Sequence, residues 1–143
     1  MLTRRTFIIV AVGLAGCTGG AGNAPASLPS GVTIVPPGPD VPPALAAYSG
    51  KWHGVWTSGL DMILVVQEIV PPHVSIVFAY GSGFWNLAGS ARVEGEINGS
   101  GISVARPSGG RFHWQMRADG SLSGSIIRQD ISRPSVGHFV REP

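Results

Sequence analysis

Arg111-Phe-His-Trp-Gln-Met-Arg117 alternates polar and apolar side chains without a break, and Ala91-Arg-Val-Glu-Gly-Glu-Ile97 repeats the pattern. Successive side chains of a strand point to opposite faces, so a period of two gathers the apolar ones on a single face. Both stretches therefore predict antiparallel strands with one face toward a core and the other toward water.

Six other stretches between residues 50 and 141 have strand character. They are separated by turn signals such as Pro71-Pro72, Asn98-Gly99 and Asp119-Gly120, and no segment has a convincing helical period. Closing the sheet on itself would leave no exposed edge strand. The sequence thus predicts an all-β fold, a small eight-stranded antiparallel up-and-down barrel. The expected strands are 50–57, 61–70, 73–80, 91–97, 101–106, 111–117, 121–129 and 135–141.

One face of every strand points into such a barrel. The side chains expected inside are those of Trp52, Trp56, Val65, Ile76, Phe78, Tyr80, Val93, Ile97, Ile102, Phe112, Trp114, Met116, Leu122 and Ile126. Two interpretations of the aromatic ones stay open. They either fill the interior completely, or Trp52, Trp56, Tyr80 and Trp114 line one open end and grip an apolar or ring-shaped ligand.

The N-terminus has the layout of an export signal. Arg4 and Arg5 precede a ten-residue apolar stretch, Phe7 to Gly16, which would rise about 15 Å as a helix, half of a bilayer's hydrocarbon core. Leu14-Ala-Gly-Cys17 resembles the lipobox of bacterial lipoproteins and contains the only cysteine of the chain. The resemblance implies that Cys17 is acylated, becomes the mature N-terminus and anchors the protein to a membrane.

The export route and the sorting signal are read from neighbouring residues. Arg4 and Arg5, followed by Phe7, also resemble a twin-arginine signal, and the general secretory route remains the alternative. Thr18, instead of an aspartate, follows the cysteine and favours the outer over the inner membrane. The expected location is the bacterial cell envelope, lipid-anchored and facing the periplasm.

Composition divides the chain into three parts. Residues 1–16 are the expected signal peptide, and residues 48–143 contain all four tryptophans and form the expected barrel domain. Between them, residues 17–47 carry the lipidated Cys17 and then a segment with seven prolines and a single charge, Asp40. That composition predicts a disordered tether, which would hold the domain about 30 Å from the membrane.

The start of the domain resembles a known family. Gly50-Lys-Trp52 is similar to the Gly-x-Trp that opens the first strand of lipocalins and other calycins, and Arg141 stands where the calycin arginine packs over that tryptophan. The stretches 48–56, 64–69 and 119–124 resemble small bacterial envelope domains of lipocalin-like type. These resemblances imply a barrel fold and no particular reaction.

Catalytic and cofactor chemistry is not indicated. The four histidines lie on four different strands without metal-ligand spacing, and no Gly-x-Ser-x-Gly motif occurs. Once the first 16 residues are removed, eight basic residues face eight acidic ones, so no basic footprint for nucleic acid remains. We therefore expect a non-enzymatic protein without cofactor or metal and without a nucleic-acid partner.

Three roles fit these observations. The first is a binding module for an apolar small molecule. The second is a protein-interaction or inhibitor domain, because Pro107-Ser-Gly-Gly-Arg-Phe112 resembles the Ser-Gly loop of lipid-anchored lysozyme inhibitors; Ser108, Gly109 and Arg111 would make its contacts with an envelope protein. The third is a purely structural component of the envelope.

Overall fold

The computed structural model describes residues 23–83, 87–106, 109–129 and 134–143. Cys17, the export signal and Ser108 lie outside the described residues, so the predictions made for them stay predictions. No helix in the described ranges has the length and apolarity needed to cross a membrane.

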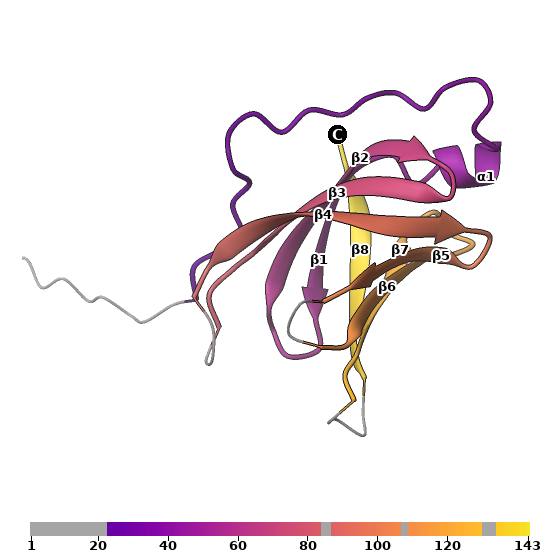
Figure 1. Cartoon of the computed structure of the whole chain (residues 1–143). Helices are drawn as coiled ribbons and strands as arrows, with labels where there is room; N and C mark the ends of the chain where they lie inside the picture. The colour runs from indigo at the N-terminus through magenta and orange to yellow at the C-terminus, as the bar shows by residue number, and fades with distance from the viewer. Residues whose placement is uncertain (1–22, 84–86, 107–108, 130–133) are drawn as a thin grey trace, which may run out of the picture.

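The described chain forms a closed barrel in which every strand pairs antiparallel with the strands before and after it, and β8 pairs with β1 (Figure 1). The predicted all-β up-and-down barrel is confirmed, and each strand begins and ends within two residues of its expected bounds. The strands are β1 Gly50–Trp56, β2 Asp61–Val70, β3 His73–Tyr80, β4 Gly89–Asn98, β5 Gly101–Ala105, β6 Arg111–Met116, β7 Leu122–Ile127 and β8 Ser135–Glu142.

The interior is a single hydrophobic cluster that contains most of the residues expected there. Val65 is the exception. Its neighbours Leu64 and Val66 belong to the cluster, so alternation turns Val65 to the outer face, where it is nevertheless buried. The stretch Met62–Val66 is apolar on both faces, which is why its pattern could not decide the register.

The segment of residues 23–42, which we call the strap, lies along the outer face of the barrel (Figure 1). The Ala26 amide donates to Oδ2 of Asp61 at 2.8 Å, and the Val35 amide donates to the carbonyl of Gln67 at 2.7 Å. The strap has no strand of its own, and it leads into one short helix, α1, Pro43–Ala46. Where a free tether was expected, residues 23–47 are packed onto the barrel.

The strap explains why β2 and β3 are apolar on both faces. Val65, Val77 and Ala79 point outward, yet each is at most 1% exposed. The strap follows β2 from Asp61 to Gln67 and covers this outer face. The strap is therefore packed against the barrel through contacts with β2.

One end of the barrel is sealed, and we call it the closed end. Leu45 of α1 packs against the core, and Tyr48 is buried with its hydroxyl accepting the Met116 amide at 2.8 Å. Trp52 is fully buried, and the guanidinium of Arg141 lies 4.2 Å from the centre of its ring. The predicted packing of Arg141 over Trp52 is confirmed, and the fold is consistent with a lipocalin-like barrel.

We predict that Val77→Ser lowers the free energy of unfolding by about 2–3 kcal/mol, because it places a hydroxyl in a dry contact under the strap. Val55→Ser is the matched control, since Val55 also faces outward but is 49% exposed on the bare side of the barrel; it should cost less than about 0.5 kcal/mol. Urea unfolding measures both.

The same measurement on a chain that lacks the strap tests what covers Val77. Without the strap, Val77→Ser should cost little, because the residue is then already exposed. An undiminished cost in that background would show that another part of the protein buries Val77.

Candidate ligand site at the mouth of the barrel

At the end opposite the closed end lie the described residues 57–60, 81–83, 87–88, 106, 109–110, 128–129 and 134, and we call this end the mouth. The barrel wall is weakest beside it. Among the described residues, β4 pairs with β5 through only three residue pairs, from Glu96↔Ser103 to Asn98↔Gly101. The rest of β4, from Gly89 to Gly95, pairs with β3 alone. A seam therefore opens between β4 and β5 and widens toward the mouth (Figure 1).

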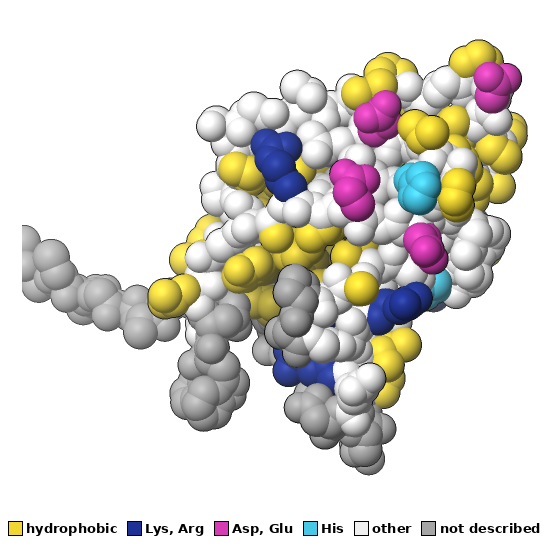
Figure 2. Space-filling view, viewed as in Figure 1, with side chains coloured by type: hydrophobic (Ala, Val, Ile, Leu, Met, Phe, Trp, Pro, Cys, Tyr) yellow, Lys and Arg dark blue, Asp and Glu magenta, His cyan; other side chains and the backbone are white. Residues whose placement is uncertain are grey.

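Apolar side chains that point into the barrel are reached through this seam. Ala91 and Val93 on β4 are only half-buried, although they pack against the core, and so are Tyr80 on β3 and Ile126 on β7. Figure 2 shows hydrophobic side chains at the bottom of a recess in this face of the molecule. The recess is concave and apolar, as small-molecule sites generally are.

A series of aromatic rings leads from this recess into the interior. The rings of Tyr80 and Phe78 lie 6.2 Å apart, those of Phe78 and Phe112 lie 5.4 Å apart, and Phe112 stacks on Trp114 at 5.3 Å. Trp56 lies 6.1 Å from Phe112. Aromatic rings in mutual contact thus extend from the recess to Trp114.

Two polar atoms in this aromatic group have no hydrogen-bond partner. They are the indole nitrogens Nε1 of Trp56 and Trp114, and both side chains are at least 98% buried. A buried indole N–H usually finds an acceptor, and leaving a donor unpaired costs about 1–3 kcal/mol. Both donors are enclosed in the interior of the barrel, so an acceptor would have to enter that interior to pair with them.

A cationic group stands at the rim of the recess. Arg106 follows β5, and its guanidinium lies 5.1 Å from the centre of the Phe112 ring. Burial lowers the pKa of Arg106, and the nearby charge of Arg128 lowers it further. No carboxylate pairs with Arg106 in the described part of the chain.

The four aromatic residues proposed as ligand contacts do not all lie together. Tyr80, Trp56 and Trp114 belong to the mouth and the ring series behind it. Trp52 lies at the closed end, where its Nε1 donates to the Tyr48 carbonyl at 3.0 Å. The arrangement gives Trp52 a structural role and leaves the other three as candidates.

The loop proposed for protein contacts is described only in part. Gly109 is exposed, and its amide donates to the Arg106 carbonyl at 3.0 Å. Arg111 is exposed at the start of β6 and lines a groove of about 270 Å³ on the outer face together with His73, Glu94 and Glu96. The loop borders the mouth and so lies next to the recess.

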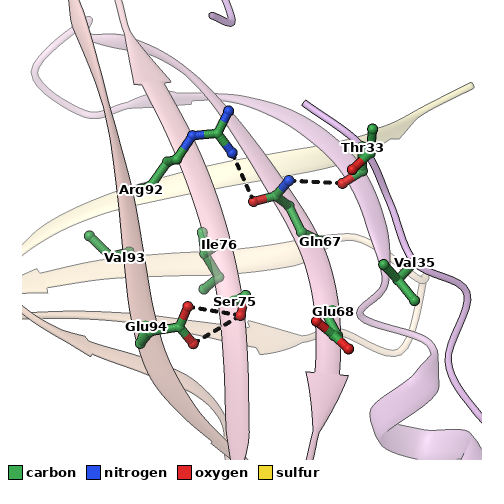
Figure 3. Close-up of a pocket in the computed structure, with 9 residues that line it drawn as sticks. All are labelled: Thr33, Val35, Gln67, Glu68, Ser75, Ile76, Arg92, Val93 and Glu94. Carbon is green, nitrogen blue, oxygen red and sulfur yellow. Dashed lines mark hydrogen bonds between the residues drawn. The ribbon is translucent and has the colours of Figure 1, made fainter. Parts of the chain in front are cut away.

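A second outer groove, of about 350 Å³, separates the strap from β2, β3 and β4 (Figure 3). Its polar groups bind one another. Gln67 donates to the Thr33 carbonyl at 2.9 Å and accepts from Arg92 at 3.4 Å, and Ser75 donates to Glu94 at 2.9 Å. These contacts hold the strap in place, and the groove presents no unpaired buried group to a ligand.

The histidines are dispersed, as their spacing predicted. His53 faces outward between strands, with Nε2 2.5 Å from Oδ1 of Asp61 and Nδ1 3.5 Å from Glu142. Nδ1 of His113 lies 3.1 Å from the Ser103 hydroxyl. Within the described ranges, no three His, Cys, Asp or Glu side chains gather closely enough to hold a metal ion.

Sequence reasoning missed Arg106 and Ala91 as parts of the site. Arg106 precedes a Pro-Ser-Gly-Gly turn and resembles any turn arginine, and Ala91 begins an ordinary alternating strand. The difference in length between β4 and β5 was not available from the sequence, because the expected strands 91–97 and 101–106 differ by one residue, whereas the observed ones have ten and five residues. A ten-residue strand beside a five-residue strand must leave part of its edge unpaired.

We predict that Trp52→Phe and Trp114→Phe differ in cost, although both tryptophans are 0% exposed. The first variant loses a hydrogen bond and replaces the indole beneath Arg141 by a smaller phenyl ring, whereas the second removes a donor that has no partner. Trp52→Phe should therefore be the more destabilising by about 1–2 kcal/mol in urea unfolding. Equal costs would mean that the Trp114 N–H is satisfied.

The chain has no recognisable relative in two comparisons: no model of a known protein family matches it, and no curated protein matches it. The function must therefore be argued from the barrel itself.

Proposed function

We propose that this protein is a lipid-anchored protein of the bacterial cell envelope whose barrel binds an apolar small molecule through the mouth. The observation that carries the binding role is the pair of unpartnered indole donors, on Trp56 and Trp114, behind a half-exposed apolar recess. A barrel built only as a scaffold gains nothing from burying two unsatisfied donors, whereas a ligand acceptor would offset their cost.

The ligand that fits this site is largely apolar and carries at least one hydrogen-bond acceptor. The aromatic series from Tyr80 to Trp114 suits a ring or a flat chain, and the acceptor reaches an indole N–H inside the barrel. An anionic or electron-rich group would lie at the rim beside Arg106. The described side chains of the recess are apolar or aromatic, so we propose binding and not catalysis.

The cellular location is proposed from the sequence. The lipobox-like Leu14-Ala-Gly-Cys17 supports acylation of Cys17, and Thr18 supports the outer membrane over the inner one. The barrel would then face the periplasm. No cofactor or nucleic-acid partner forms part of this proposal.

Cys17→Ser tests the anchor. The variant should appear in the soluble periplasmic fraction or accumulate with its signal uncleaved, because no thiol remains to be acylated. Fractionation followed by mass spectrometry of the mature N-terminus measures both outcomes. A correctly processed, membrane-bound variant would contradict the anchor.

Ala91→Trp tests the binding site. The new side chain would fill the recess from β4, so the fluorescence of the neutral probe N-phenyl-1-naphthylamine with residues 23–143 should fall several-fold. Val140→Trp is the control, since Val140 is 48% exposed on the outer face of β8. It should leave probe binding unchanged.

The same titration decides between the two main roles. Probe binding that is equal in the wild type, Ala91→Trp and Val140→Trp would contradict a site in the mouth. That result would favour the protein-interaction role, and Gly109 and Arg111 would be the first residues to substitute.

A further inference from the structure

The described chain begins at the mouth. The Ala24 amide lies 2.5 Å from the Ser82 hydroxyl, and the Ser82 amide donates to the Ala24 carbonyl at 2.9 Å. Ser82 lies two residues after the end of β3, which is at the mouth. In chain order, the strap runs from the mouth to the closed end (Figure 1). The part of the chain before residue 23 is therefore attached to the barrel at the mouth.

The distance to the proposed anchor is short. Six peptide steps separate Cys17 from Asn23, and at full extension they reach at most about 20 Å. The eight residues of β8 rise about 20 Å along the axis of a normally tilted barrel. If the closed end faced the bilayer, the segment from Cys17 to Asn23 would have to lie fully extended along the whole length of the barrel.

The charges of the mouth suit an anionic surface. Its described residues include Arg106 and Arg128, and Arg111 begins the neighbouring strand. The one described acid at this end is Asp61, which is already bound to His53 and to the Ala26 amide. Arg106 and Arg128 have no acidic partner in the described ranges. The described residues of the mouth therefore carry an excess of positive charge.

Exposed apolar side chains lie beside these arginines. Leu87, in the connection from β3 to β4, is 86% exposed, and Ile127, at the end of β7, is 54% exposed. Basic residues together with exposed large apolar ones are the combination that binds the interface of an anionic bilayer.

From these four observations we propose that the mouth of the barrel is a membrane-contact surface, which rests on a bilayer of anionic lipids. The inference rests on the proposed acylation of Cys17. It adds an orientation to the proposed function: the seam and the apolar recess open beside the lipid surface, so the ligand would enter from the membrane and not from bulk water. The strap would place the barrel directly on the membrane that anchors it.

Two single-cysteine reporters test this orientation in the full-length, exported and acylated protein. Leu87→Cys places a label at the mouth, and Val70→Cys, a matched site that is 59% exposed at the closed end, serves as its counterpart. Each is labelled with the fluorophore NBD after reconstitution into vesicles. The vesicles are phosphatidylcholine with or without phosphatidylglycerol, and a lipid carrying a headgroup nitroxide acts as the quencher.

On anionic vesicles, the label at residue 87 should be quenched several-fold more strongly than the label at residue 70, and the contrast should shrink without phosphatidylglycerol. Arg128→Glu should reduce the contrast, whereas Arg117→Glu, at the closed end, should leave it unchanged. Equal quenching at both sites, or stronger quenching at residue 70, would overturn the proposed orientation.

Intact-mass measurement of the same samples separates this inference from the proposal beneath it. An unmodified Cys17 would show that the protein is not anchored through this residue, and the proposed orientation would be rejected as well. An acylated Cys17 with equal quenching at both sites would keep the anchor and reject the membrane-facing mouth.

Discussion

The contact of Arg141 with Trp52 joins the last strand to the first, at the join where six residue pairs of β1 and β8 close the barrel. The guanidinium lies over the Trp52 ring and also donates to the carbonyls of Ser49, at 2.6 Å, and Ala47. One side chain of β8 thus fixes the start of β1 and the end of the helix that precedes it. Gly50 allows this approach: its φ is +125°, and a Cβ there would lie 2.5 Å from the guanidinium. Any larger residue at position 50 would push the arginine off the ring.

The strands were predictable because their patterns are local. An alternation of polar and apolar residues can be recognised from a few neighbouring residues, and Arg111–Met116 shows it clearly. The register of Met62–Val66 was not predictable, because the face that the strap covers is as apolar as the face inside the barrel. For the strap, the sequence predicts a free tether, because a proline-rich segment cannot form a core of its own. The strap is ordered by contacts with residues distant in sequence, such as that of Val35 with Gln67. Such contacts cannot be predicted from composition.

The candidate site shows a different limit of sequence reasoning. Trp52 and Trp114 occupy equivalent positions in alternating strands, and both are completely buried. What separates them is a hydrogen bond, made by one indole to Tyr48 and absent for the other. That difference depends on which end of the barrel is sealed, and the sealing depends on α1 and Arg141. The tryptophans were therefore correctly chosen as interior residues, while the division between scaffold and site required the assembled barrel.

Neighbouring strands of the barrel are joined by different numbers of residue pairs, and this difference affects where the wall opens. Three residue pairs join β4 to β5 in the described chain, and six join β1 to β8, where Arg141 adds its contact. Local opening breaks the fewest hydrogen bonds at the first of these joins. The wall then divides into two four-stranded leaves, β1–β4 with the strap and β5–β8, which stay connected along β1 and β8. The interior of such a barrel is adjustable: if the protein binds a ligand as proposed, widening the seam between β4 and β5 would admit a wider one, while the pairing of β1 with β8 keeps the fold intact.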